Sequence, residues 1–232
     1  LREFIMSDRS KRYKSIKKEF DSDKEYNINE GLKMFKAHAS LKFDETLEVA
    51  VNLGVDPKHA DQIVRGIVSL PNGTGKKYKI AVFAKDDLAK QALDAGADYV
   101  GQEDLAEKFE KENLLVDKVI AAPDMMAIVG KLGKILGPKG LMPNPKLGTV
   151  TNDIKKIIAD IKAGLIEFKA DKTGIVHAGI GKKSFSVEKL EQNYKNFIDA
   201  IIKAKPKGVK GTYLKSIFIS FTMGPSLKIS NK

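Results

Sequence analysis

Two short segments of the sequence carry residue types that proteins use to handle phosphate groups. The first, residues 73–76, reads Gly-Thr-Gly-Lys, like the end of a nucleotide-binding P-loop. A P-loop needs an earlier glycine, a serine or threonine after the lysine, and a helix whose amides face the phosphates. Here Lys77 follows, and the next segment has the pattern of a strand. We therefore interpret residues 73–76 as a flexible joint between domains.

The second segment, residues 171–174, reads Asp-Lys-Thr-Gly and has the letters of an aspartyl-phosphate site. It lies in a predicted tight turn, where aspartate and glycine are favoured for backbone reasons. The sequence contains no Gly-x-Ser-x-Gly or His-Glu-x-x-His pattern, and it has no cysteine. We therefore predict that the protein is not an enzyme and holds neither a metal nor a cofactor. A phosphate- or nucleotide-handling α/β enzyme is the alternative.

Two clusters of lysines could position the phosphates of a nucleic acid. One surrounds a predicted hairpin, and the other lines the loop before the last predicted strand. Taken alone, each cluster is also compatible with a solvated turn. Their members are Lys169, Lys172, Lys182 and Lys183 in the first cluster and Lys203, Lys205, Lys207 and Lys210 in the second.

Two aromatic positions add a flat apolar surface to this chemistry. Phe43 follows Lys42, and Phe221 begins the sequence Phe-Thr-Met-Gly-Pro at the end of a predicted strand. Apolar groups beside hydroxyl and backbone donors pack on the sugars and unpaired bases of RNA. Packing in the protein core is the alternative for both phenylalanines.

The net charge of +11 is concentrated in the last third of the chain. Residues 1–70 and 71–150 each have a net charge of +1, whereas residues 151–232 have a net charge of +9. This distribution indicates a polyanionic partner that is contacted mainly by the last third. The longest apolar run, around residues 125–136, falls short of the roughly 20 residues that span a bilayer, so we expect no membrane partner.

Hydrophobic periodicity predicts an α/β fold. Strands and helices alternate between residues 78 and 122, as in a parallel sheet covered by helices. The glycines and prolines in residues 137–145 break regular structure and predict a long loop. The strands at 165–169 and 175–180 are predicted to form a hairpin. The remaining predicted strands are 47–53, 79–84, 99–100, 116–122 and 214–221, with an apolar run at 64–70, and the predicted helices are 28–35, 87–95, 103–112, 125–136, 154–161 and 187–203.

Two Gly/Pro-rich joints bound the alternating block, which indicates a domain inserted into a split domain. We predict that residues 1–70 and 151–232 form one discontinuous domain, and that residues 1–18 are a basic tail within it. Residues 71–150 are predicted to form the inserted domain.

Four motifs occur in the order found in one known family. They are Lys42-Phe43-Asp44-Glu45-Thr46, Val64-Arg65-Gly66, the Gly-Pro-Lys-Gly-Leu-Met-Pro-Asn-Pro loop at 137–145, and Thr222-Met223-Gly224-Pro225. From about residue 11 to residue 229, the chain resembles the family of large-subunit ribosomal protein one, the protein of the mobile side stalk, in its bacterial or organellar type.

The resemblance implies a split α/β sandwich domain with an inserted Rossmann-like, three-layer α/β domain. It also implies that the split domain binds a bent helical junction of large-subunit ribosomal RNA. The site residues carried over from the family are Lys42, Phe43, Glu45, Thr46, Lys169, Asp171, Lys172, His177, Ser216, Thr222, Met223, Gly224 and Pro225.

By the same resemblance, the stalk helps deacylated tRNA to leave the exit site, and bacterial members repress translation of their own mRNA. The expected partners are therefore ribosomal RNA, exit-site tRNA and the chain's own mRNA, with a free protein that is monomeric. The expected location is a cytoplasmic ribosome, with the matrix of an organelle as the alternative.

Overall fold

The structure is a computed structural model that describes residues 11–21, 24–37, 42–111, 114–206 and 208–230. Helices and strands mix throughout, which confirms the predicted α/β class. The chain divides into two compact units, one formed by Leu1–Gly75 with Phe168–Lys232 and the other by Lys76–Glu167. We call them the split unit and the inserted unit.

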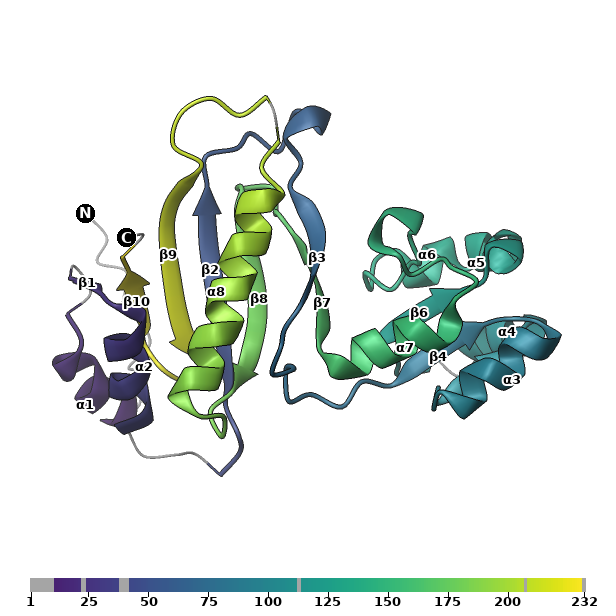
Figure 1. Ribbon diagram of the computed structural model, residues 1–232, viewed down its shortest axis with the longest axis horizontal. Helices are drawn as coiled ribbons and strands as arrows, with labels where there is room; N and C mark the ends of the chain where they lie inside the picture. The colour runs from purple at the N-terminus through teal and green to yellow at the C-terminus, as the bar shows by residue number, and fades with distance from the viewer. Residues whose placement is uncertain (1–10, 22–23, 38–41, 112–113, 207, 231–232) are drawn as a thin grey trace, which may run out of the picture. The chain divides into compact units, whose positions relative to one another are not determined.

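The split unit contains a five-stranded sheet with strand order β1-β10-β9-β2-β8. The central strand β2 pairs antiparallel with β8 on one side and with β9 on the other. One long helix, α8, lies along β2 and β8 in Figure 1 and also packs against α2. The strands are β1 (Glu25–Tyr26), β2 (Thr46–Leu53), β8 (Ile175–Lys182), β9 (Leu214–Phe221) and β10 (Ser226–Ile229), and the helices are α2 (Ile28–Ala37) and α8 (Val187–Lys203).

Strand β2 explains why this sheet has one covered face and one open face. Its residues Leu47, Val49, Val51 and Leu53 are buried, and the residues between them are partly or fully exposed. Alternate side chains of a strand point to opposite faces, so the apolar set lies against the helices. The other face is left open to carry polar residues.

The predicted hairpin is present only at its turn, where Ala170 forms an antiparallel bridge with Val176. Beyond that bridge its two strands belong to different sheets. Strand β7 (Leu165–Lys169) pairs with β3 (Arg65–Ser69), whereas β8 pairs with β2. The buried ring of Phe168 provides the physical reason. It packs edge-on against Phe197 of α8, and a Cβ atom on Gly66 of β3 would lie only 2.8 Å from its Cζ atom. Phe168 therefore holds β7 to β3 instead of to β8.

The inserted unit has three layers around a parallel sheet of order β5-β4-β6. Residues of α3 and α7 share one apolar cluster with one face of the sheet, and residues of α4, α5 and α6 share a cluster with the other face. Its strands are β4 (Ile80–Phe83), β5 (Tyr99–Gly101) and β6 (Lys118–Ala121), and its helices are α3 (Asp86–Asp94), α4 (Glu103–Lys111), α5 (Met126–Lys131), α6 (Gly133–Leu136) and α7 (Ile154–Ala163).

The second boundary of the inserted unit differs from the predicted one. It lies after Glu167 instead of after residue 150, because α7 belongs to the inserted unit. The buried residues Ile154, Ile158 and Ile161 of α7 pack in one cluster with residues of β4 and β6. The apolar stripe of α7 was recognised from the sequence, but the sheet that it covers was not.

Part of the predicted basic tail is helical. Residues Lys11–Glu19 form α1, where Ile16 is buried, and the following Phe20 stacks on Phe35 of α2. Residues 1–10 of the predicted tail lie outside the described part of the chain. Short 3₁₀ turns occur at Ala60–Gln62, Pro123–Met125 and Pro145–Leu147. Among the described residues, no helix combines the length and the apolar character needed to cross a membrane.

Candidate nucleic-acid interface

The register of the large sheet brings the first and last sequence motifs together. Thr46 at the start of β2 lies opposite Lys182 at the end of β8, and Leu47 lies opposite Phe221 at the end of β9. The segment that leads into β2 and the segment that leaves β9 therefore meet at one edge of the sheet. We call this edge, formed by residues 42–46, 182–184 and 221–225, the sheet end.

Hydrogen bonds join the two segments directly. The amide of Thr46 donates to Oγ1 of Thr222 at 3.0 Å, and the amide of Thr222 donates to the carbonyl oxygen of Thr46 at 3.2 Å. The Thr222 hydroxyl also donates to that carbonyl oxygen at 3.4 Å. The Thr222 side chain thus holds two chain segments that are 176 residues apart in sequence.

Glu45 adds a buried carboxylate to this junction. The residue is only 1% exposed, and its Oε2 atom accepts a hydrogen bond of 3.2 Å from the amide of Met223. Its Oε1 atom lies 3.6 Å from Nζ of Lys183, and the Glu45 carbonyl oxygen accepts a hydrogen bond from the Lys183 amide. Because the carboxylate is enclosed by these partners, Glu45 positions the loop around Met223 and leaves the outer surface to other residues.

Two apolar side chains project from the fixed loops into solvent. Phe43 is 49% exposed and Met223 is 54% exposed, so neither belongs to the core. Lys42, next to Phe43, is exposed as well. Gly224 follows Met223, and Pro225 is buried behind it. The alternative of core packing therefore fails for Phe43 but holds for Phe221, which is 3% exposed.

Three further residues at the sheet end were not in the predicted site. The Lys182 Nζ atom donates to Oγ1 of Thr46 at 2.7 Å, and Nζ of Lys183 lies 5.7 Å from the centroid of the Phe221 ring. The Ser184 hydroxyl donates to Oδ2 of Asp44 at 2.7 Å. The one sequence signal for the two lysines was their place in the first lysine cluster. That grouping did not separate them from Lys169 and Lys172.

His177 and Ser216 lie on the open face of the same sheet, away from its end. His177 of β8 is exposed and lies opposite Ala50 of β2, while Ser216 of β9 lies opposite Asn52. A shallow hollow of about 450 Å³ occupies this face and is lined by His177, Glu48, Phe218 and Ser220 among others. The two predicted residues thus extend the sheet end along the open face.

Lys169, Asp171 and Lys172 lie at the opposite edge of the sheet. They precede β8, and its first residue, Ile175, pairs with Asn52 near the end of β2. Six strand residues of about 3.3 Å each separate Asn52 from Thr46, so the two groups are roughly 20 Å apart. The predicted cluster around the hairpin is therefore divided, with Lys182 and Lys183 at one edge and the two exposed residues Lys169 and Lys172 at the other.

Asp171 serves the turn at that opposite edge. Its Oδ1 atom accepts hydrogen bonds from the Thr173 hydroxyl at 2.7 Å, the Thr173 amide at 2.8 Å and the Ile175 amide at 2.9 Å. The hydrogen bond from the Thr173 hydroxyl is the main cause that lowers the pKa of Asp171, followed by the bond from the Ile175 amide. Gly174 completes the turn with a φ of 81°.

The phosphate-handling alternative gains no support from the segment at residues 73–76. No helix follows it, since residues 76–79 have no regular secondary structure and strand β4 begins at Ile80. The Lys76 side chain pairs with Asp117 at 2.6 Å, and Gly75 packs so closely that a Cβ atom there would lie 2.7 Å from Cγ of Lys182. Gly73 and Gly75 have φ values of 68° and 72°, which suit a turn at the joint.

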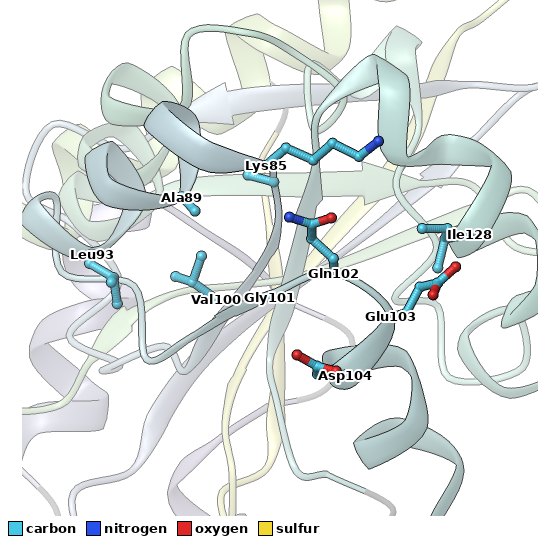
Figure 2. Close-up of a pocket in the computed structure, with 10 residues that line it drawn as sticks. Lys85, Ala89, Leu93, Val100, Gly101, Gln102, Glu103, Asp104 and Ile128 are labelled. Atoms are coloured by element: carbon cyan, nitrogen blue, oxygen red, sulfur yellow. The ribbon is translucent and has the colours of Figure 1, made fainter.

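The inserted unit contains a pocket of about 620 Å³ at the carboxyl ends of β4 and β5. Figure 2 draws Lys85, Gln102, Glu103 and Asp104 among the residues that line it. The two acidic residues begin helix α4, where a bound phosphate would need positive charge. This lining is therefore unlike that of a phosphate site. Among the described residues, no group of three or more His, Asp or Glu side chains could hold a metal ion.

The comparison with known protein families agrees with the resemblance drawn from the four motifs. Residues 35–225 match the model of the family described as Ribosomal protein L1p/L10e, and this match covers most of the chain and both units. It includes β2, the inserted unit and the Thr-Met-Gly-Pro segment. The chain therefore belongs to the ribosomal protein L1p/L10e family and is a structural protein of the large ribosomal subunit.

Proposed function

We propose that this protein binds ribosomal RNA through the sheet end and the adjoining open face of the split unit. The observation that carries the proposal is the double connection between Thr46 and Thr222 beside two exposed apolar side chains, Phe43 and Met223. Such a rigid edge holds its donors and apolar groups in place before the RNA arrives. Preorganisation of this kind reduces the entropy lost on binding.

The chemistry of the edge suits a bent or unpaired RNA segment better than a regular duplex. Phe43 and Met223 offer surfaces for sugars or unstacked bases, and Lys42 offers a charge for a phosphate. His177 and Ser216 supply polar groups farther along the open face. Lys169 and Lys172, roughly 20 Å from Thr46 at the other edge, would contact a second part of the same RNA.

The identity of the bound RNA and the further roles in translation are proposed from membership of the family. We propose that the bound RNA is the side-stalk junction of the large subunit, that the protein assists release of deacylated exit-site tRNA, and that it represses its own mRNA by binding a similar RNA. In this account the protein works on the ribosome as a monomer that catalyses no reaction and needs no cofactor.

One experiment tests the central proposal. The purified chain is mixed with large subunits that lack it, and nuclease cleavage of the subunit RNA is mapped. We expect co-sedimentation and protection of one stalk junction, with neither outcome for a Thr222→Val, Met223→Ala double variant that remains folded. Protection elsewhere, or equal protection by the double variant, would show that the sheet end is not the interface.

A further inference from the structure

Helix α8 carries an asparagine within its apolar stripe. The buried residues Leu190, Tyr194, Phe197 and Ile201 recur at the spacing of one helix face, and Asn193 lies among them. The Asn193 residue is 0% exposed. A polar side chain at such a position is unfavourable unless hydrogen bonds satisfy it. Its hydrogen-bond partners therefore indicate its role.

The amide group of Asn193 holds two separate segments of the split unit. Its Nδ2 atom donates to the carbonyl oxygen of Ile180 in β8 at 2.8 Å and to that of Gly73 at 2.9 Å. Its Oδ1 atom accepts from the backbone amide of Asn72 at 3.2 Å. Because the two carbonyl oxygens can only accept, the nitrogen of the side-chain amide must point toward them. The side chain thus has one orientation, in which it connects α8 both to residues 72–73 and to the last part of β8.

The first of these segments contains a β-bulge. The pairing of β2 with β8 passes from Gly179 directly to Gly181, so Ile180 is an extra residue in β8. A bulge disrupts the ladder locally and changes the direction of the residues that follow. Here it brings Lys182 opposite Thr46, where an uninterrupted register would place Gly181. The hydrogen bond from α8 fixes the carbonyl group of the extra residue and thereby holds the bulge.

The second segment reaches Lys182 from another side. Residues 72–73 lead to Gly75, where an added Cβ atom would lie only 2.7 Å from Cγ of Lys182. The Lys182 Nζ atom donates to Oγ1 of Thr46 at 2.7 Å. Asn193 therefore restricts Lys182 both through the bulge that precedes it and through the chain segment beside it.

We propose that Asn193 is a positioning residue for RNA binding, which holds the bulge and residues 72–75 so that Lys182 presents its ammonium group to an RNA phosphate at the sheet end. This role rests on the RNA-binding function proposed above, and Asn193 acts through Lys182 without contacting the RNA. A lysine that is already held in place loses less side-chain entropy on binding than one that is free in solvent. An ammonium group has three donors, so the bond to Thr46 leaves donors for phosphate oxygens.

The test compares Asn193→Ala with a matched control at the other end of α8. Tyr213→Phe removes the hydrogen bond that the buried Tyr213 hydroxyl donates to the carbonyl oxygen of Ile201 at 3.0 Å. Strand β9 begins next to it at Leu214, opposite Leu53, so the control acts at the edge away from the sheet end. Both variants leave a buried carbonyl oxygen without a hydrogen bond, so both should unfold at a lower urea concentration than wild type.

The first measurement needs no RNA. Acylation of lysines in the free protein is mapped by mass spectrometry, with the exposed residues Lys169 and Lys172 of the opposite edge as internal references. Relative to these references, we expect Lys182 to react faster in Asn193→Ala than in wild type, and at the wild-type rate in Tyr213→Phe. Equal reactivity of Lys182 in all three proteins would overturn the proposal. If Asn193→Ala does not fold, Asn193→Ser, which retains a hydroxyl donor, takes its place under the same criteria.

The second measurement is the affinity of the full chain for an RNA fragment of the stalk junction. Asn193→Ala and Lys182→Gln should each bind roughly tenfold more weakly than wild type, the loss expected for one charged contact. Because Asn193 acts through Lys182, the double variant should bind within about twofold of the weaker single variant, whereas independent losses would multiply to about a hundredfold. Tyr213→Phe should bind like wild type. Losses that multiply, or an equal loss in Tyr213→Phe, would overturn the proposal, because Asn193 would then serve only the core.

Failure of the function on which this role rests gives a different result. If the Thr222→Val, Met223→Ala protein keeps its full affinity for the stalk RNA, the sheet end is not the interface, and the RNA part of the proposal fails with it. The reactivity of Lys182 in the free protein still shows in that case whether Asn193 positions this lysine.

Discussion

The sheet end and the opposite edge of the same sheet both offer lysines to RNA, but they hold their groups in different ways. At the sheet end, Thr46, Thr222 and Glu45 connect two distant segments through hydrogen bonds, and the apolar side chains project from that fixed frame. At the opposite edge, Lys169 and Lys172 are exposed beside a turn that Asp171 holds through hydrogen bonds to Thr173 and Ile175. Fixed donors and apolar groups select one RNA shape, whereas exposed lysine charges add affinity for any phosphate backbone. The difference predicts specificity at the sheet end and nonspecific affinity at the opposite edge.

The largest expected effect comes from the buried carboxylate of the sheet end. Glu45→Ala leaves the Lys183 ammonium and the Met223 amide without this partner, and breaking a buried ion pair typically costs about 3 kcal/mol or more of unfolding free energy. Binding to the stalk RNA should fall as well, because the loop around Met223 loses its anchor. Urea unfolding measures the first effect and filter binding measures the second. A Glu107→Ala variant, which removes an exposed pair with Lys111, is the control and should change stability little. If Glu45→Ala is as stable as wild type, the connection between the two segments of the sheet end does not depend on this carboxylate.

The next effect separates the hydrogen bonds that join the two segments of the sheet end from the exposed side chains that these segments carry. Thr222→Val removes both side-chain hydrogen bonds to Thr46 and should weaken stalk RNA binding by roughly 1 to 3 kcal/mol, with some loss of stability. Met223→Ala should weaken binding by a similar amount with stability unchanged, because its side chain is 54% exposed. Calorimetry and unfolding on both variants provide the comparison. If neither variant loses affinity while both fold, the sheet end does not contact RNA.

A third, smaller effect concerns the inserted unit as a whole. Replacement of residues 76–167 by a short Gly/Ser linker should leave a folded split unit, since loop closure depends only weakly on length. The shortened protein should still recognise the stalk RNA with an affinity within about tenfold, or 1.4 kcal/mol, of the whole chain, because the proposed contacts all lie in the split unit. The measurement is the affinity of both proteins for one RNA fragment at one salt concentration. A loss of more than a hundredfold, about 2.7 kcal/mol, would make the inserted unit a main contact.

The sequence predicted most elements of both units but not their partners. Alternation in β2 and the 3.6-residue period of α8 are local signals, and both elements were found where predicted. The hairpin failed because the choice between β3 and β8 as partner of β7 depends on Phe168, Gly66 and Phe197, which are far apart in sequence. The boundary of the compact unit after Glu167 also depends on distant residues, because an amphipathic helix shows its apolar stripe but not the sheet that the stripe covers.

The candidate site shows the same limit. Lys42, Phe43 and the Thr-Met-Gly-Pro segment have recognisable chemistry in the sequence, and the structure brings them to one edge. The lysine cluster, in contrast, was treated as one group because its members are close in sequence, although a whole strand separates Lys172 from Lys182. Lys207 of the second predicted lysine cluster lies outside the described residues. Charge pattern therefore predicted the partner class, but strand register was needed to place the charges.

The smallest expected effect tests whether a hydrogen-bonded network by itself marks an RNA contact. Asp171 has a network as complete as that of the sheet end, yet all its bonds serve the turn before β8. Its pKa is lowered in the folded protein, so its stabilising contribution is fully present above the unfolded pKa of about 3.9 and is lost as pH falls through the folded pKa. Asp171→Asn should therefore be less stable than wild type at pH 7, and the gap between them should begin to narrow below about pH 4.

The variant should bind the stalk RNA nearly as well as wild type at pH 7, because an aspartate that serves a turn adds no attraction for phosphate. Urea midpoints at pH 7 and pH 3 check the stability part, and filter binding checks the RNA part. Thr173→Val is the matched control, since it removes the hydroxyl that contributes most to the low pKa while it keeps the carboxylate. If Asp171→Asn loses tenfold or more in RNA affinity while Thr173→Val does not, the carboxylate itself contacts the RNA. Both edges of the sheet would then recognise the RNA through fixed polar groups, and the contrast between the two edges would no longer hold.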